Sequence, residues 1–306
     1  MFENNIHNNG QLVYHYTTID TLMKILGDID EDHLTFHASS MLTLNDSSEF
    51  YYGVKEFRRL LPNIENTIGH IDESIKLSKI FADQDKYYNG KFNKLFCELL
   101  MQFNKTPFIV STSSLGDYIP MWSMYGDSGR GVSIGLDIAN LYKKRSDNSG
   151  KLVLDYTDYN LNQPHPIKIR TQLSLNNPAI AIIKKEYKEY IQGVGNVTNS
   201  ERETFYSKVL CSMSSSIAAT IKHPAFSFEN EWRILQYVAD NKDVQYKSNS
   251  NGKITPYIKI KIPKKNLKKI IVGPKSNPQV KQILERMLYN HNQIHCKVKA
   301  SRCPLI

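Results

Sequence analysis

The stretch FSFENEWRIL, residues 226–235, is the segment on which the predicted fold depends most. Its apolar residues suggest a β-strand with one buried face, and two carboxylates, Glu229 and Glu231, stand two places apart within it. On a strand the two side chains would share one face, separated by about 6.6–6.8 Å. Like charges at that spacing cost energy unless a ligand or a cation uses them. Arg233 falls on the same face and offers the structural alternative, an ion pair within the strand.

On both sides of this stretch, short strands alternate irregularly with helices. Segments with a period of two are typical of strands, and they lie at residues 11–17, 33–39, 108–114, 131–137 and 256–262. Because the order lacks a regular strand-helix-strand pattern, the sequence predicts an α+β fold with a mixed or antiparallel sheet. No linker or repeat divides the chain, so we expect a single domain over residues 1–306 with helical insertions at about 50–105 and 160–222.

Composition indicates a globular protein without a membrane segment. Of the 306 residues, 41% are hydrophobic, and no window approaches the roughly 18 apolar residues of a membrane span. The first residues lack the pattern of a secretory signal, so we expect a cytoplasmic protein with no membrane partner. The four cysteines form no C-x-x-C pair, so neither a zinc site nor a disulfide framework is expected.

Positive charge is concentrated in the last 54 residues of the sequence. Residues 253–306 hold thirteen Lys or Arg and one acid, whereas the whole chain has a net charge of +9. Such asymmetry favours phosphate-bearing partners, either a nucleic acid or a dinucleotide. The alternation in YIKIKI, residues 257–262, also fits a strand whose lysines face solvent or protect a sheet edge.

A polar cluster lies on the first predicted strand. His15 and Thr17 point to one face while Tyr16 points to the other, so an imidazole and a hydroxyl are presented together. This pair suits hydrogen bonds to ribose hydroxyls or to an amide. A histidine at the edge of the core, bonded to a neighbouring backbone group, is the structural alternative.

Two more clusters lie in the middle of the chain. Ser111, Thr112 and Ser113 continue a strand past its apolar part and form a polar wall for a flat ligand, although turns and caps use the same residue types. In MWSMYGDSGRG, Trp122 and Tyr125 are three apart and share a face if the segment is helical. An exposed aromatic pair would stack on a nicotinamide or a base, and burial in the core is the alternative.

In chain order, His-x-Thr on an early strand, Ser-Thr-Ser in the middle and Glu-x-Glu on a late strand resemble the motifs of the ADP-ribosyltransferase fold. The resemblance implies a split sheet that binds NAD as substrate, releases nicotinamide and transfers ADP-ribose to a protein or nucleic-acid acceptor. The glycosidic bond breaks through an oxocarbenium-like state that a carboxylate stabilises. The resemblance therefore implies that Glu231 stabilises this state and that Glu229 orients or deprotonates the nucleophile.

The same resemblance implies which residues bind NAD. The serine hydroxyls would position the ribose, the imidazole would hold a ribose hydroxyl, and an aromatic ring would stack on the nicotinamide. No metal ligands are expected, and the expected setting is a bacterial toxin or an antiphage effector. The expected NAD-binding residues are His15, Tyr16, Thr17, Ser111, Thr112, Ser113, Trp122, Tyr125 and Arg233.

A broader resemblance covers about residues 12–275. The segments LVYHYTT, LNDSSEF, MWSMYGDSGRGVSIGLD, IKHPAFSFENEWRI and IIVGPKS are similar, in this order, to motifs of the bacterial family of unknown function DUF2971. This resemblance implies no activity. The chain also departs from the transferases, because His15 stands where those with Ser-Thr-Ser and Glu-x-Glu motifs carry Arg, and because the expected helical insertions exceed the compact form of that fold.

Two other functions are alternatives to the transferase. A metal-dependent hydrolase or nuclease would use His15, His223, Glu229 and Glu231, with His33 or His37 as a further ligand. The sequence contains no H-E-x-x-H motif and no compact His/Asp cluster, and His33 and His37 form only a loose pair. A non-enzymatic nucleic-acid-binding protein would use the C-terminal lysines, and its binding would depend on salt without any release of nicotinamide.

Overall fold

A computed structural model describes the chain except for several segments. The described residues are 11–27, 32–43, 48–87, 107–139, 141, 145–146, 152–153, 164–171, 175, 178–194, 218–238, 241–248, 252, 254–290 and 296–304. Among them, no helix is both long enough and apolar enough to cross a bilayer.

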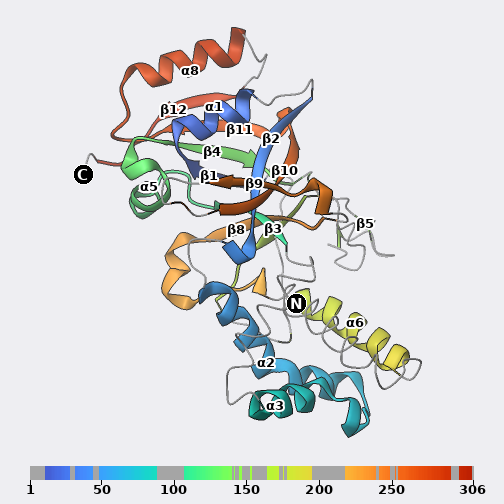
Figure 1. The fold of residues 1–306 in the computed structure, drawn as a ribbon. Coiled ribbons are helices and arrows are strands. Elements are labelled where there is room, and N and C mark those ends of the chain that lie inside the picture. Colours follow the sequence, from blue (N-terminus) through green and yellow to red (C-terminus); the bar gives the residue numbers. More distant parts are fainter. Residues whose placement is uncertain are drawn as a thin grey trace.

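A ten-stranded, mostly antiparallel sheet forms the centre of the fold (Figure 1). Its main path runs in the order β12-β11-β4-β1-β3-β2-β10-β9, with β8 paired to β3 and β7 paired to β8 beside this path. Of the named strand pairs, β11 with β12 is parallel and the others are antiparallel. The strands are β1 (Leu12–Thr17), β2 (His33–Ser40), β3 (Phe108–Ser113), β4 (Val132–Asp137), β7 (His165–Lys168), β8 (Glu231–Gln236), β9 (Gln245–Ser248), β10 (Ile254–Pro263), β11 (Leu267–Val272) and β12 (Lys297–Ala300), with a separate pair of β5 (Arg145–Ser146) and β6 (Leu152–Val153). The predicted α+β class with a mixed or antiparallel sheet is confirmed.

The sheet divides at β3. Along one side, β8 pairs with every residue of β3 from Phe108 to Ser113. Along the other side, β2 pairs with Phe108 and Ile109 only, and β1 pairs with Ser113 only. Strands β1 and β2 therefore part from each other, and the middle of β3 lies in the opening between them.

Helices cover both faces of the sheet, and three further helices form a separate layer at one end of it. Helices α1 and α8 pack on one face, where their apolar residues join the strands in one buried cluster, and α5 packs on the other face beside β1. Helices α2, α3 and α6 form a separate layer with its own core, which meets the sheet at β3, β7 and β8 (Figure 1). The helices are α1 (Ile19–Gly27), α2 (Ser48–Ile68), α3 (Leu77–Tyr87), α5 (Ile119–Tyr125), α6 (Pro178–Val194) and α8 (Gln279–Asn290).

The expected helical insertions are partly described. Helices α2 and α3 fill the described part of the insertion at 50–105, and β7 and α6 lie within the one at 160–222. Residues 88–106 and 195–217, with shorter stretches at 160–163, 172–174 and 176–177, lie outside the described residues.

The prediction that all of FSFENEWRIL is a strand is wrong. Residues Pro224–Glu229 form a 3₁₀ turn, and Asn230 follows in the left-handed region with φ of 45°, so the strand β8 begins only at Glu231. Proline at the first position of the turn has the φ that a helical turn needs, and asparagine tolerates positive φ better than most residues. Glu229 therefore approaches the sheet from a turn rather than along the strand.

We predict that Gly131→Ala destabilises the junction between β1 and β4. A Cβ at Gly131 would lie 2.2 Å from the backbone oxygen of Thr17, so a strand would have to shift. We expect the free energy of unfolding to fall by about 1–3 kcal/mol, the usual cost of overpacking. Urea unfolding followed by circular dichroism measures it.

The matched control is Gly27→Ala at the end of α1, where an added Cβ meets nothing within 4 Å. We expect this change to alter the free energy of unfolding by less than about 0.5 kcal/mol. Equal stability of the Gly131→Ala variant and the wild type would contradict the described packing of β4 against β1.

Candidate functional site

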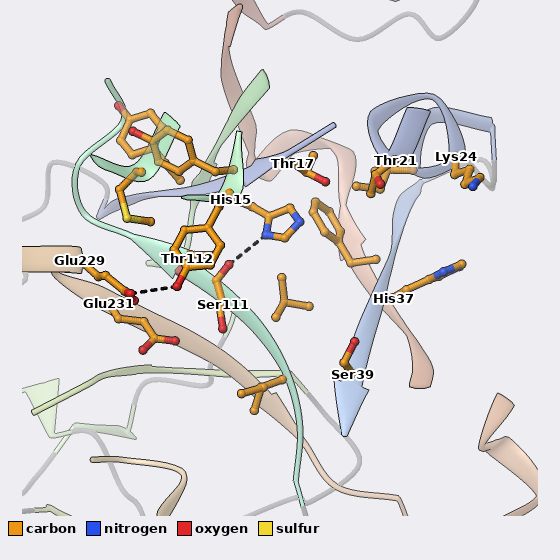
Figure 2. A pocket seen from close by; sticks show the side chains of 18 of the residues that line it. His15, Thr17, Thr21, Lys24, His37, Ser39, Ser111, Thr112, Glu229 and Glu231 are labelled. Carbon is orange, nitrogen blue, oxygen red and sulfur yellow. Dashed lines mark hydrogen bonds between the residues drawn. The ribbon is translucent and has the colours of Figure 1, made fainter. Parts of the chain in front are cut away.

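A cavity of about 410 Å³ opens where β1 and β2 part. Residues of β1, β2 and β3 line its middle, α1 and β9 border one end, and α5 with the start of β8 border the other (Figure 2). Its volume lies within the range of ordinary small-molecule sites, which are about 300–1,000 Å³. The cavity therefore has room for a ligand that contacts both halves of the divided sheet.

His15 spans the division of the sheet. Its Nδ1 lies 2.9 Å from the backbone oxygen of Ser111, and because a carbonyl only accepts, Nδ1 carries the hydrogen (Figure 2). Burial lowers the pKa of His15, the hydrogen bond to Ser111 raises it, and the charge of Lys247 lowers it further, so the net shift is downward. At neutral pH the imidazole is neutral, and its Nε2 is left as a hydrogen-bond acceptor.

Ser111 is exposed although it lies in the middle of a sheet. The reason is the division, since neither β1 nor β2 pairs with β3 at this residue. Its neighbour Thr112 is buried, and its hydroxyl donates to the backbone oxygen of Trp232 at 2.9 Å. Of the two side chains, that of Ser111 is the exposed one.

The carboxylate end of the cavity is a buried ion cluster of three acids and two cations. Lys222 Nζ lies 2.9 Å from Glu49, 2.6 Å from Glu229 and 3.2 Å from Glu231. Arg233 contacts both oxygens of Glu231, at 2.9 and 3.1 Å, and reaches Glu49 at 2.9 Å. With all five groups ionised, the cluster keeps one negative charge.

The cations hold Glu231 in its ionised form. Burial raises the pKa of Glu231, but the charges of Arg233 and Lys222 outweigh burial, and the net shift is downward from the ordinary value of 4.5. A hydrogen bond from Ser111 acts in the same direction. Burial lowers the pKa of Lys222, but its contacts with Glu231, Glu49 and Glu229 outweigh burial, and the net shift is upward. Glu231 is therefore a permanent anion at neutral pH.

Tyr125 connects α5 to this cluster. Its hydroxyl donates to Glu229 Oε1 at 2.9 Å, the bond that Figure 2 shows with a dashed line. Burial and the charge of Glu229 raise the pKa of Tyr125, so the phenol stays protonated and remains a donor. Glu229 is thus fixed from two sides, by Tyr125 and by Lys222.

The structure brings together most of the expected site residues but not all of them. His15, Tyr16, Thr17, Ser111, Thr112, Tyr125, Glu229 and Glu231 line the cavity. The other three expected residues, Ser113, Trp122 and Arg233, are described by the structure but do not line the cavity.

These three side chains are buried, and their polar atoms are bonded inside the protein. The hydroxyl of Ser113 donates to the backbone of Glu229, the indole of Trp122 donates to Asp117, and Arg233 is 0% exposed within the ion cluster. A ligand in the cavity would not contact these three side chains, because they are buried behind the residues that line it. Arg233 instead forms the ion pair with Glu231 that the sequence analysis gave as the structural alternative.

Four further charged residues of the cavity were not expected from the sequence: Lys24, Glu49, Lys222 and Lys247. Glu49 belongs to the segment LNDSSEF and Lys222 to IKHPAF, both of which carry the DUF2971 resemblance, and this was the available signal. No pattern in the sequence indicates Lys24 or Lys247, because their approach depends on where α1 and β9 lie in space.

The described part of the chain offers few side chains for the alternative function, a metal-dependent hydrolase or nuclease. There, no group of three or more His, Cys, Asp or Glu side chains has an arrangement that could hold a metal ion. The three carboxylates of the ion cluster already contact Lys222 and Arg233, which occupy the place that a metal ion would take.

Comparison with known proteins gives one match. The family model described as "Protein of unknown function (DUF2971)" matches residues 121–234. The match takes in β4 and most of α5 and β8, with Tyr125, Glu229 and Glu231 of the site. Among curated proteins and among solved structures, nothing matches the chain. The match is narrower than the expected span of 12–275, and the family description assigns no activity.

We predict that Glu231 contributes to stability above the pKa of an unfolded glutamate and loses this contribution in acid. Its pKa is lowered in the folded state, so the contribution is fully present above pH 4.5 and disappears as the pH falls further. The difference in free energy of unfolding between the wild type and Glu231→Gln should therefore be largest at pH 7 and shrink toward pH 3. Urea unfolding of both proteins between these values measures it.

The control for this series is Glu285→Gln, because Glu285 is exposed and forms a surface ion pair with Lys281. We expect that change to have a small effect at every pH. A difference for Glu231→Gln that stays constant from pH 7 to pH 3 would contradict the ionised, cation-bound state of Glu231.

Proposed function

We propose that this chain is an NAD-consuming enzyme, either an ADP-ribosyltransferase or an NAD glycohydrolase, with its active site in the cavity between β1 and β2. The observation that carries the proposal is the charge polarity of the cavity. Glu229 and Glu231 lie at one end and Lys24 at the other, with His15 between them (Figure 2). NAD has the complementary polarity, a cationic nicotinamide riboside joined to two anionic phosphates.

The positive end consists of Lys24 and Lys247. Burial and the charge of Lys24 lower the pKa of Lys247, so the two ammonium groups act on each other across a common space. A phosphate between them would remove this repulsion. The ion pair of Lys24 with Asp20 is on the exposed surface and is a weak competitor.

The negative end suits the bond-breaking step. When the bond between the ribose C1′ and the nicotinamide nitrogen breaks, its electron pair leaves with nicotinamide, and positive charge develops on the ribose. The excess negative charge of the ion cluster, with Glu231 kept ionised, would stabilise that charge. Because Lys222 and Arg233 already contact Glu231, the carboxylate needs no reorganisation during the reaction.

The second carboxylate suits the bond-forming step. A lone pair of the acceptor, or of water in a glycohydrolase, forms the new bond to C1′, and its proton passes to Glu229 as general base. Tyr125 and Lys222 hold this carboxylate in place. The neutral His15 would accept a hydrogen bond from a ribose hydroxyl at Nε2, and Ser111 would offer its hydroxyl nearby.

The sheet supports an ADP-ribosyltransferase-like arrangement, because a split, mostly antiparallel sheet with the cavity at the split is what the motif resemblance implies. Under this proposal the protein acts in the cytoplasm, where NAD is available. The acceptor is a protein or a nucleic acid, and the setting is a bacterial toxin or antiphage defence.

The first test is release of nicotinamide from NAD. The wild type should release nicotinamide, and Glu231→Gln should do so about 10²–10³-fold more slowly, the usual loss for one preorganised electrostatic group. Glu285→Gln, an exposed glutamate on α8, should keep the wild-type rate. Chromatography measures nicotinamide, and circular dichroism checks that each variant is folded. No release by the wild type, or equal release by folded Glu231→Gln, would sink the proposal.

The second test addresses the positive end of the cavity. Lys247→Gln should raise KM for NAD about tenfold and leave kcat nearly unchanged, because the phosphates bind equally in the ground state and the transition state. Steady-state kinetics over a range of NAD concentrations measures both constants. A fall in kcat with no change in KM would place the phosphates elsewhere.

A further inference from the structure

Four cations gather on one face of the sheet at its β11–β12 edge: Lys269 on β11, Lys297 and Lys299 on β12, and Arg302 just beyond β12. We call these four residues the basic edge. The register places Lys269 directly opposite Lys297, and Ile271 opposite Lys299, so the three lysines leave the same face. Adjacent strands are about 4.8 Å apart and alternate residues about 6.6 Å apart, so the lysines start within about 8 Å of one another.

The charges of the basic edge repel one another. Burial and the charges of Lys299, Arg302 and Lys297 lower the pKa of Lys269, and the carboxylate of Asp117 offsets this only in part. Like charges directly opposite each other on neighbouring strands are destabilising. A partner with negative charge would remove this repulsion and stabilise the arrangement.

Acids of the described chain do not neutralise the basic edge. Within the described residues none of the four cations forms a salt bridge, and Lys269 instead lies 5.7 Å from the centre of the Tyr14 ring. Asp117 is engaged elsewhere, because its carboxylate accepts from the indole of Trp122, the hydroxyl of Ser301 and the backbone nitrogen of Arg302. As far as the described residues go, the positive charge is therefore available to a partner.

We propose that the basic edge binds the phosphate backbone of a nucleic acid. Each of the four cations can neutralise one backbone phosphate, and the long side chains of Lys and Arg extend their reach beyond the roughly 8 Å over which the lysines start. Phosphate binding would relieve the repulsion among the lysines and release counterions from the nucleic acid. Backbone contacts carry no sequence information, so the binding is independent of base sequence.

This inference is independent of the proposed function. Four strand spacings in register lead from Lys269 through Gly135, Tyr14 and Ser113 to Glu231, a distance of about 19 Å. The basic edge is therefore remote from the carboxylate end of the cavity, although Tyr14, which Lys269 contacts, also lines the cavity. Nucleic-acid binding is measured without NAD, and release of nicotinamide is measured without nucleic acid, so either proposal can fail alone.

The test is fluorescence anisotropy with a fluorescein-labelled 20-nucleotide RNA of mixed sequence, measured between 50 and 200 mM KCl. Four phosphate contacts on a single strand give a slope of log K against log salt of about −2.8, which is about 50-fold weaker binding across this range. Lys297→Gln with Lys299→Gln should reduce the slope to about −1.4. Both lysines lie at the edge of the sheet, so the variant is expected to fold.

The matched control is Lys185→Gln with Lys188→Gln, which changes the net charge equally on α6, in the helical layer at the opposite end of the molecule (Figure 1). This variant should keep the wild-type slope. Equal slopes for the two double variants would overturn the proposal, because binding would then follow net charge alone. Binding to vesicles that contain phosphatidylserine, with no binding to the RNA, would also overturn it and assign the basic edge to a lipid surface.

Discussion

The whole arrangement depends on the way strand β3 is shared between its neighbours. One side of β3 is paired along its full length by β8, but the other side is paired by β2 at the start and by β1 at the end. Backbone groups between these two contacts lack a strand partner on that side. The imidazole of His15 instead bonds the carbonyl of Ser111. The cavity lies along the middle of β3, where neither β1 nor β2 pairs with it.

The buried ion cluster adds a second constraint, because it joins the two layers of the molecule. Glu49 comes from α2 in the helical layer, whereas Glu231 and Arg233 come from β8 in the sheet. Removing one member of a buried ion pair leaves an uncompensated charge and costs about 3–5 kcal/mol. The two layers are thereby held in one relative position at the floor of the cavity, and the carboxylates are oriented before any ligand arrives.

Local sequence patterns predicted the strands well and the side-chain environments less well. Alternation identified β1, β2, β3, β4 and β10, and motif order predicted that His15, Ser111 and Glu231 would lie in one place, as they do in the cavity. Phe226 and Phe228 imitate strand alternation, which concealed the turn that Pro224 and Asn230 produce.

The rest depended on tertiary structure. Alternation assigns Ser113 and Arg233 to the face of Glu231, but it does not say which positions on that face open to the cavity and which are covered. The contact of Glu49 with Arg233 joins residues 184 positions apart, and no local spacing encodes it. Trp122 and Tyr125 share a short helix, yet one is buried and the other reaches the cavity, because α5 packs on Tyr16 through Trp122.

Asp117 links the beginning of α5 to residues Ser301, Arg302 and Cys303, which follow the last strand. Because α5 carries Tyr125, and Tyr125 holds Glu229, one wall of the cavity is secured by residues that are translated after the described residues that line the cavity. β1 and β3 emerge from the exit tunnel long before position 303 does. A nascent chain therefore carries an unfinished cavity, and the site is completed after translation has passed that position.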